Sequence, residues 1–398
     1  MGGHGVTDRP ARAAILRELA LLFLQLGTTA FGGPAAHIAM MEHEVVRRRS
    51  WMERQEFLDL LAATNLIPGP NSTELAIHIG RQRAGWPGLL VAGGCFILPA
   101  SALTLLIAWA YVRYGSLPAA GWALYGVKPV IIAIVLRALW ALGRTALKSR
   151  GLAALALVAT IACFAGMNEL LLLLLSGVLI AVSRSGASDP GTPARTPAAL
   201  MPGAAASAGA VGSAGAATAA GATAFGLLPL FLFFLKTGAV LFGSGYVLLA
   251  FLRADLVERW HWLSPTQLLD AVAIGQLTPG PVFTTATFIG YLLGRTPGAV
   301  VATIGIFLPA FVLVAGSGLL LPRLRRSPTA AAFLDGVNVA SLALMAAVTW
   351  HLGRAAVVDL LTAVVAAASA VVLLRFRTGS IWLVLAGALI GAVARGGG

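Results

Sequence analysis

The chain has 398 residues, of which 58% are hydrophobic and 11% are charged, and its mean hydropathy is +0.87. Since a soluble domain carries about 25% charged residues, this composition excludes a soluble globular protein. The net charge of +13 does not indicate nucleic-acid binding, because the arginines lie in short loops between apolar runs, as in membrane proteins. These runs do not alternate in polarity as barrel strands do, so the sequence predicts an all-α polytopic membrane protein.

Cofactor chemistry has little support in the sequence. Cys95 and Cys163 lie inside apolar stretches and are expected to be buried hydrophobic residues, with neither a disulfide nor a metal between them. The six histidines do not cluster with cysteines as in zinc sites. No nucleotide-binding G-x-x-x-x-G-K-[ST] motif occurs. We therefore expect no cofactor, no metal and no enzymatic activity.

The first half, residues 15–185, is predicted to contain five or six membrane segments. Its first run follows several arginines but is not a signal peptide, because its end, Gly27-Thr-Thr-Ala-Phe-Gly-Gly, has a counterpart in the middle of the chain. Residues 151–183 are either two short spans or a hairpin, since neither run reaches about 20 residues. The apolar segments are 15–36, 57–80, 87–112, 119–143, 151–166 and 168–183.

A change of composition separates the halves at residues 186–224. The first part, to about residue 202, is a Pro/Ser/Gly linker. Residues 203–224 consist almost entirely of Ala, Gly, Ser and Thr. That stretch is either more linker or a weak extra membrane span, and both interpretations stay open.

The second half, residues 225–396, repeats the first. Residues 58–70, LDLLAATNLIPGP, correspond to residues 269–281, LDAVAIGQLTPGP, at a spacing of 211 residues. The same spacing pairs Phe31-Gly32 with Phe242-Gly243, and a spacing of 210 pairs later positions. The apolar segments of this half are 225–247, 268–293, 297–321, 329–352, 355–374 and 379–395.

Each half contains one Pro-Gly-Pro inside an apolar segment, and each is expected to be a broken span or a re-entrant hairpin. Non-helical backbone at membrane depth survives only inside protein or beside a watery cavity. In a single copy, a kink that merely shapes helix packing is an equal alternative. Two copies at matched positions favour a transport site.

The basic loops indicate the relative orientation of the halves. Arg and Lys gather in the N-terminal tail and in loops 81–86 and 144–150 of the first half, but in the non-equivalent loops of the second half. Equivalent loops therefore lie on opposite sides of the membrane, which is typical of an inverted repeat.

Four motifs resemble the paired signatures of the chromate ion transporter family, in its long two-domain form. They are Phe31-Gly-Gly-Pro, Pro68-Gly-Pro, Phe242-Gly-Ser-Gly-Tyr and Gln276-Leu-Thr-Pro-Gly-Pro. The resemblance implies an antiporter or efflux carrier of the inner membrane that expels chromate and takes sulfate as a mimic. The halves differ at Asn65 and Gln276, which leaves the physiological oxyanion open, and a homodimer is one assembly that we leave open.

We predict that the substrate is bound by backbone N–H groups at the two breaks, because the start of a helix carries unpaired donors and a positive dipole end. The alternative at the Phe-Gly motifs is close helix packing through small residues. The candidate substrate-binding residues are Phe31, Gly32, Gly33, Asn65, Pro68, Gly69, Pro70, Asn71, Lys128, Phe242, Gly243, Ser244, Gly245, Gln276, Pro279, Gly280, Pro281 and Thr284.

Ionisable residues inside apolar segments are further candidates. Lys128 or Lys236 is a candidate counter-charge for the anion, although both lysines would also be explained by extension to the membrane interface. Glu74 is the candidate proton-coupling carboxylate, and its alternative is a charge at the start of a helix. His78, one turn further on, is a candidate relay partner or an interface residue. Asp270 is expected to be a helix-entry charge at the membrane surface.

Three other functions remain as alternatives to chromate export. A carrier of sulfate or another oxyanion would use the same scaffold, and an anion channel is less consistent with an inverted repeat. An intramembrane enzyme would need converging acid, base or metal-binding residues, and the sequence shows no His/Asp/Glu cluster with ligand spacing. The expected partners are a small inorganic anion and the lipid bilayer.

Overall fold

The computed structural model describes residues 8–31, 33–115, 117–185, 225–242, 245–325, 327–376 and 379–396. Within these ranges all regular secondary structure is helical, as the sequence predicts. Four helical segments of the described chain are long and apolar enough to cross a membrane: Asn71–Tyr114, Pro118–Ala146, Val282–Ser317 and Pro328–Ala356.

The two halves present the same order of elements. The first half contains α1 (Asp8–Thr29), α2 (Pro34–Glu42), the π-helix η1 (His43–Arg48), α3 (Arg54–Thr64), α4 (Asn71–Tyr114), α5 (Pro118–Ala146), α6 (Arg150–Phe164) and α7 (Glu169–Ser185). The second half contains α9 (Leu227–Val240), η2 (Gly245–Val247), α10 (Leu248–Phe251), the π-helix η3 (Leu252–Arg259), α11 (Pro265–Leu277), η4 (Val282–Thr284), α12 (Thr285–Arg325), α13 (Pro328–Ala356), α14 (Leu360–Arg375) and α15 (Ser380–Gly396).

Helix α4 bends, because 44 residues of straight helix would measure about 66 Å against a hydrocarbon layer of about 30 Å. The bend lies at Ala84 and Gly85, where Gly85 has a φ of 64°. Helix α12 bends at the equivalent Gly294 and Arg295, and Arg295 has a φ of 54°. The segment expected at 57–80 therefore consists of α3, a break, and the first part of α4. The segment expected at 87–112 is the part of α4 that follows the bend.

The central helices α5 and α13 run antiparallel. Contacts along α5 in one direction meet residues of α13 and its flanks in the other: Tyr125 with Asp359, Ile132 with Gly353, Gly143 with Leu342 and Lys148 with Asp335. Because α5 and α13 are equivalent in the repeat, the axis that relates the halves lies across their length. This is the arrangement of an inverted repeat, as the loop charges predict.

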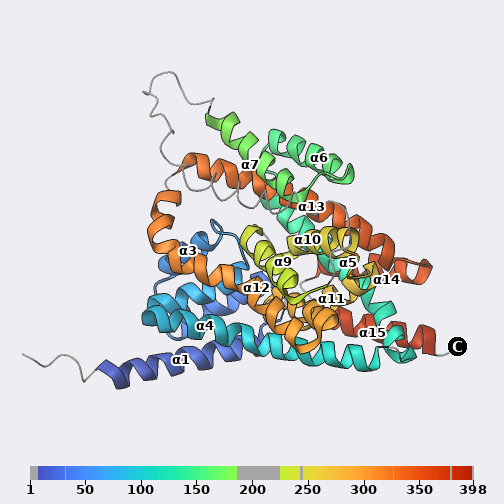
Figure 1. Cartoon of the computed structure of the whole chain (residues 1–398), viewed down its shortest axis with the longest axis horizontal. Coiled ribbons are helices and arrows are strands. Elements are labelled where there is room, and N and C mark those ends of the chain that lie inside the picture. The colour runs from blue at the N-terminus through green and yellow to red at the C-terminus, as the bar shows by residue number, and fades with distance from the viewer. Residues whose placement is uncertain are drawn as a thin grey trace, which may run out of the picture.

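The halves exchange their last helices. In Figure 1, α6 and α7 lie beside α13 of the other half, while α14 and α15 pack on α5. Glycines allow this close packing, since a side chain at Gly126 of α5 would collide with the backbone of Gly387 on α15. The equivalent Gly336 of α13 lies in the same way against Gly177 on α7.

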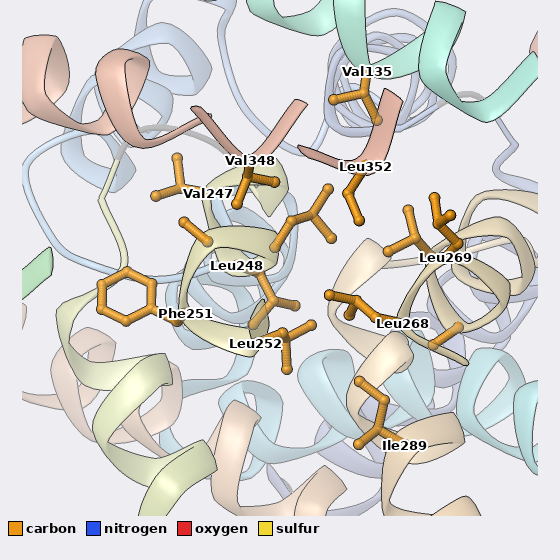
Figure 2. Packing of buried hydrophobic residues seen from close by; sticks show 14 of the residues in the cluster. Val135, Val247, Leu248, Phe251, Leu252, Leu268, Leu269, Ile289, Val348 and Leu352 are labelled. Atoms are coloured by element: carbon orange, nitrogen blue, oxygen red, sulfur yellow. The ribbon is translucent and has the colours of Figure 1, made fainter. Parts of the chain in front are cut away.

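The largest apolar core lies where these helices meet. Figure 2 shows Leu248, Leu252 and Leu268 of the second half packed near Val348 of α13, with Val135 contributed by α5 of the first half. Each of these side chains is buried, so the core joins the two halves rather than lying within either.

Helices α7 and α9 meet opposite ends of the bundle. Arg184 at the end of α7 pairs with Asp335 near the start of α13, at 2.7 Å. Phe225, just before α9, packs at the bend of α12, about 3.0 Å from where a side chain at Gly294 would lie. About 45 Å of helix separates that bend from α13. The linker 186–224 and the weak span expected at 203–224 lie outside the described residues.

Candidate functional site

The helix breaks lie at the two Pro-Gly-Pro sequences. Helix α3 ends at Thr64 and α4 begins at Asn71, while α11 ends at Leu277 and η4 begins at Val282 and continues into α12. The central glycines adopt positive φ values, 140° at Gly69 and 85° at Gly280. Residues that carry a side chain rarely adopt such φ values, so the backbone conformation of each break depends on glycine.

Each break is hydrogen-bonded to the other half. The N–H of Gly69 donates to the carbonyl oxygen of Leu241 at 2.8 Å, and the N–H of Gly280 donates to that of Ala30 at 2.9 Å. Ala30 and Leu241 immediately precede Phe31 and Phe242 of the Phe-Gly motifs. The four motifs therefore form one symmetric unit, and the glycine N–H groups bind protein carbonyls rather than a ligand.

A cavity of about 60 Å³ lies between the two breaks. Its lining consists of four pairs of residues that are equivalent in the repeat: Pro34 with Gly245, Pro70 with Pro281, Asn71 with Val282, and Ser72 with Phe283. The volume is several times what one water requires, so the cavity has room for a few waters or one small polyatomic ion. Of the predicted residues, Pro70, Asn71, Gly245 and Pro281 line it.

Two helix starts lie in the lining of this cavity. Asn71 and Ser72 are the first residues of α4, and Val282 and Phe283 are the first residues of η4. The first N–H groups of a helix have no acceptor within it, and the dipole is positive at that end. The later N–H groups are occupied: that of Glu74 donates to Pro70 and that of Thr284 donates to Pro281, both at 3.0 Å.

The side chains that were expected to donate to the substrate at the breaks instead donate to protein groups. The hydroxyl of Thr284 donates to the carbonyl of Pro281 at 2.9 Å, and that of Thr285 donates to Val282 at 2.8 Å, so both satisfy their own turn. Neither Asn71 nor Ser72 caps α4, because the helix already begins at Asn71. The Asn71 amide instead donates to the side chain of Asn65 at 2.7 Å.

The remaining predicted motif residues surround these breaks at different depths. The Phe31 side chain is 39% exposed, and Gly33 precedes α2 with a φ of 80°. Phe242, Pro68 and Gln276 are partly buried and Pro279 is buried. The predicted residues Gly32, Gly243 and Ser244 lie outside the described residues.

Glu74 is fully buried beside the first break. Neither oxygen of its carboxyl group has a hydrogen-bond partner in the described structure. The carboxyl group lies against Gly69, since a side chain added there would collide with Oε1 of Glu74. His78, one helical turn further along α4, is 6% exposed and its Nε2 also lacks a partner. Both groups are thus buried without a hydrogen-bond partner at these atoms, and the relay expected between them stays a prediction.

Lys128 lies in a different environment from the one expected. Its ammonium group is 3.0 Å from Oδ1 of Asp270 on α11, and the Tyr111 hydroxyl donates to Oδ2 of Asp270 at 2.8 Å. Asp270 is only 2% exposed, so the expectation that it marks the membrane surface is wrong. A lysine and a tyrosine compensate its burial. Lys128 is not among the described residues that line the cavity.

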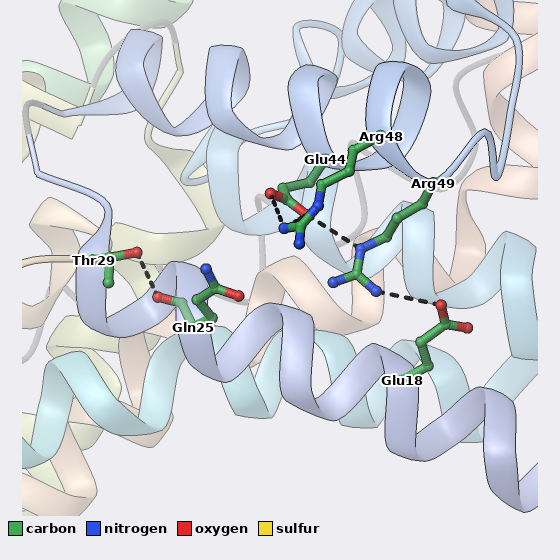
Figure 3. Close-up of polar contacts among 6 residues, drawn as sticks. All are labelled: Glu18, Gln25, Thr29, Glu44, Arg48 and Arg49. Carbon is green, nitrogen blue, oxygen red and sulfur yellow. Dashed lines mark hydrogen bonds and ion pairs between the residues drawn. The ribbon is translucent and has the colours of Figure 1, made fainter.

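Lys236 also has an acidic partner. It pairs with buried Asp255 at 2.6 Å, and Arg259 pairs with the same carboxylate at 2.8 Å. The equivalent cluster of the first half appears in Figure 3, where Glu44 contacts both Arg48 and Arg49. Lys236 therefore neutralises the Asp255 carboxylate. Extension of the lysine side chain to the membrane interface alone does not account for this contact.

A buried histidine beside the cavity escaped the sequence analysis. His37 on α2 is 1% exposed. Its Nδ1 is 3.3 Å from the hydroxyl of Ser72, and its Nε2 is 3.0 Å from the carbonyl oxygen of Ala30. Its position one turn after the first Phe-Gly motif was the available signal. The equivalent residue of the second half, Leu248, gives no polar counterpart that would have drawn attention to it.

Sequence comparison places this arrangement in a family. The profile of the chromate transporter family matches residues 17–181 and 228–392. The chain belongs to the chromate transporter family. Each match covers one set of the motifs that enclose the cavity, so the symmetric unit is built from two copies of the family's repeat.

Named relatives cover most of the chain. A chromate transport protein of Cupriavidus metallidurans is 33% identical over 95% of this chain and 93% of its own length. A probable chromate transport protein of Synechococcus elongatus is 31% identical over 87% of both chains. A chromate transport protein of Pseudomonas aeruginosa is 32% identical over 85% of this chain and 81% of its own. No solved structure matches the chain.

Proposed function

We propose that this protein is a secondary active transporter that exports chromate across the inner membrane and thereby confers chromate resistance. Residues 15–185 and 225–396 act as the two repeats, and the cavity between their Pro-Gly-Pro breaks is the binding site. The observation that carries the proposal is the lining of that cavity by four equivalent pairs of residues, including the starts of two helices.

The chemistry of the cavity suits a tetrahedral dianion. Helix starts bind anions through backbone N–H groups and the positive end of the helix dipole, without a fixed positive charge. A lysine or arginine in contact would hold a dianion more tightly and slow its release. None of the described residues that line the cavity is charged. Such a site favours repeated binding and release.

The membrane potential favours export. Moving one elementary charge through 100 mV corresponds to about 2.3 kcal/mol, so a dianion that leaves a negative-inside cell without a proton gains about 4.6 kcal/mol, and each proton that leaves with it lowers this gain by about 2.3 kcal/mol. Glu74 is the proposed proton-coupling carboxyl group, because a negative charge next to Gly69 would repel the anion. Protonation of Glu74 would therefore accompany occupation of the cavity.

The orientation follows from the basic loops. Arg81 donates to the carbonyl of Ala315 at 2.7 Å, and Lys148 pairs with Asp335, so loops 81–86 and 144–150 lie near the ends of α12 and start of α13. Helix α12 ends at Arg325, and Arg323 belongs to the same last turn. We propose that this end of a multi-pass protein faces the cytoplasm.

Chromate accumulation tests the proposal. Cells that express the protein are expected to retain less radiolabelled chromate than cells that express Gly280→Leu at an equal membrane level. Inverted vesicles should accumulate chromate when a positive-inside potential is imposed. Equal retention in both strains would contradict export, and potential-independent flux would contradict coupling to the membrane potential.

Sulfate is the competing substrate, since it is also a tetrahedral dianion. Competition in the same vesicles separates the two anions: excess sulfate leaves chromate uptake nearly unchanged if chromate is preferred. If sulfate at equal concentration reduces chromate uptake by about half, the site accepts both oxyanions alike, and abolition of uptake would make sulfate the preferred substrate.

A further inference from the structure

We infer that His37 and Ser72 form a proton-dependent donor switch at the cavity, so that binding of the oxyanion takes up a proton at His37. The inference deepens the proposed function and rests on it. Its basis is the pair of contacts that hold the imidazole between a carbonyl oxygen and a hydroxyl group that belongs to the cavity lining.

The contacts determine the neutral state of the ring. A carbonyl oxygen only accepts hydrogen bonds, so Nε2 of His37 must donate its hydrogen to Ala30. In a neutral imidazole the other nitrogen, Nδ1, is then an acceptor. The Ser72 hydroxyl therefore donates to Nδ1, and its hydrogen points away from any anion in the cavity.

Protonation reverses the second bond. When Nδ1 binds a proton from solution, both ring nitrogens donate, and the Ser72 oxygen becomes the acceptor. The hydroxyl group then rotates and directs its hydrogen into the cavity, while no covalent bond of Ser72 changes. The cavity gains one hydroxyl donor and a positive charge on its inner side, and both stabilise a bound oxyanion.

The linkage has a definite sign. If the anion binds the protonated form more tightly, anion binding raises the affinity of His37 for its proton by the same factor. Anion affinity is then highest at low pH and falls as the pH rises through the pKa of His37 in the complex. The proton and the anion occupy the site together.

Other titratable groups lie on the elements packed against α2. Helix α4 carries Glu74 and His78, which lack hydrogen-bond partners as described above. The π-helix η1 carries Glu44, which is paired with Arg48 and Arg49, and Arg49 also pairs with Glu18 of α1. No ion pair joins any of these groups to His37 in the described chain, so the ring interacts with Ser72, Ala30 and the edge of Phe96.

The second half lacks the switch. The residues equivalent to His37 and Ser72 are Leu248 and Phe283, and both are buried apolar side chains. The cavity is thus symmetric in its backbone but carries this relay on one side. A structural histidine that only fixed the packing of α2 would require no hydroxyl in the cavity wall.

Chromate binding to the purified full-length protein tests the inference. Calorimetry between pH 5 and 8, in buffers of different ionisation enthalpy, gives both the affinity and the number of protons taken up. In the wild type, affinity should fall by up to about tenfold per pH unit. Chromate also takes up a proton in this range, so the readout is the difference between variants, in which the ligand's own proton cancels.

His37→Gln retains a donor for Ala30 but does not titrate, and it should flatten the pH dependence and reduce proton uptake by up to one per anion. Ser72→Ala should lower affinity at pH 5 toward its value at pH 8, and it decides the matter if His37→Gln does not fold. Glu74→Gln removes the neighbouring carboxyl group and the proton proposed to bind there, and it should keep the part of the pH dependence that His37→Gln removes.

Two results would separate this inference from the proposed function. Chromate binding with the same pH dependence in wild type, His37→Gln and Ser72→Ala would overturn the inference alone. A dependence that disappears only in Glu74→Gln would also overturn it, and would assign the proton to Glu74. Absence of chromate binding by the wild type would overturn the proposed function and this inference with it.

Discussion

The two halves enclose the cavity with the same backbone but with different side chains. Both contribute a Pro-Gly-Pro break, a glycine with positive φ and the start of a helix. In the first half, four polar or titratable positions have apolar or neutral equivalents in the second: His37 with Leu248, Ser72 with Phe283, Glu74 with Thr285 and His78 with Phe288.

This difference separates two tasks. Recognition of an oxyanion through backbone N–H groups requires only the shared backbone, so it is symmetric. Proton exchange requires titratable side chains, and near the cavity these belong to the first half. Leu248, which Figure 2 shows, and Phe288 instead belong to the apolar core. In the proposed function, the second half therefore contributes backbone and apolar packing, and the first half contributes the titratable side chains.

The largest expected effect comes from the two glycines of the breaks. A side-chain carbon at Gly280 would lie 2.6 Å from Cβ of Ala100, whereas one at Gly69 would meet the flexible end of Glu74. Gly280→Leu and Gly69→Leu should each reduce vesicle transport by more than about 100-fold, since a misplacement of about 1 Å has effects of that size.

The alanine variants sharpen this comparison. Gly280→Ala should impair transport more than Gly69→Ala, because helix α4 cannot move as readily as the Glu74 side chain. Membrane levels of all four variants must match the wild type. Normal transport by Gly69→Leu at a normal level would show that the site is wrongly placed.

Glu74 and Thr285 test the one-sided chemistry directly. Glu74→Gln should lower proton-coupled chromate transport about tenfold, a size typical of coupling between two sites. Thr285→Val should stay within about twofold, because its hydroxyl serves its own helical turn. Transport at several imposed pH gradients measures both. Equal losses in the two variants would remove the distinction between the halves.

The lysines provide the next comparison. Lys128→Ala leaves Asp270 buried with only Tyr111, and breaking a buried ion pair costs about 3–5 kcal/mol. Lys236→Ala leaves Asp255 paired with Arg259, so the free energy of unfolding should fall by about 1 kcal/mol or less. Chromate affinity, measured as half-saturation in vesicles, should also fall more for Lys128→Ala, because the unpaired Asp270 carboxylate lies on α11, the helix that leads into the second break.

A double variant shows how Lys128 acts. If Lys128→Ala with Asp270→Asn restores stability but not chromate affinity, Lys128 contributes to binding. Restoration of both would leave the backbone donors alone to recognise the anion.

The smallest expected effect concerns the starts of α3 and α11. Ser264 caps α11 in a capping box with Gln267, whereas the equivalent Glu53 makes no side-chain cap to α3. Ser264→Ala should reduce the free energy of unfolding by about 1 kcal/mol, and Glu53→Ala by a few tenths. Thermal unfolding in detergent compares them. A larger loss for Glu53→Ala would contradict this assignment of the caps.

The fold was largely predictable, because it follows from features that repeat. The apolar runs predicted the helices, and the two Pro-Gly-Pro sequences predicted the breaks. The opposed loop charges predicted the antiparallel relation that the contacts between α5 and α13 show. Each of these signals is local or is a comparison of two local patterns.

The partners of polar groups were not predictable in the same way. Asp270 resembled a surface charge because polar residues precede it, and only the packing of α11 on α5 brings it to Lys128. Likewise, nothing near His37 in the sequence indicates the Ser72 hydroxyl 35 positions away. The hydroxyl of Thr284 was expected to face a ligand, but the carbonyl of Pro281 in its own turn is a nearer acceptor.

The exchange of terminal helices has a consequence for how the protein is made. Helix α5 emerges from the ribosome long before α14 and α15, so its packing face stays exposed to lipid until the chain is nearly complete. In the same way, the faces of α6 and α7 that pack on α13 stay uncovered until α13 has been made. Neither half can reach its final packing alone, because the last two helices of each half pack on the central helix of the other. Each half nevertheless contains all the helices that it contributes to this packing. Two separate polypeptides, divided between α7 and α9 and made in one cell, should therefore assemble into a working transporter.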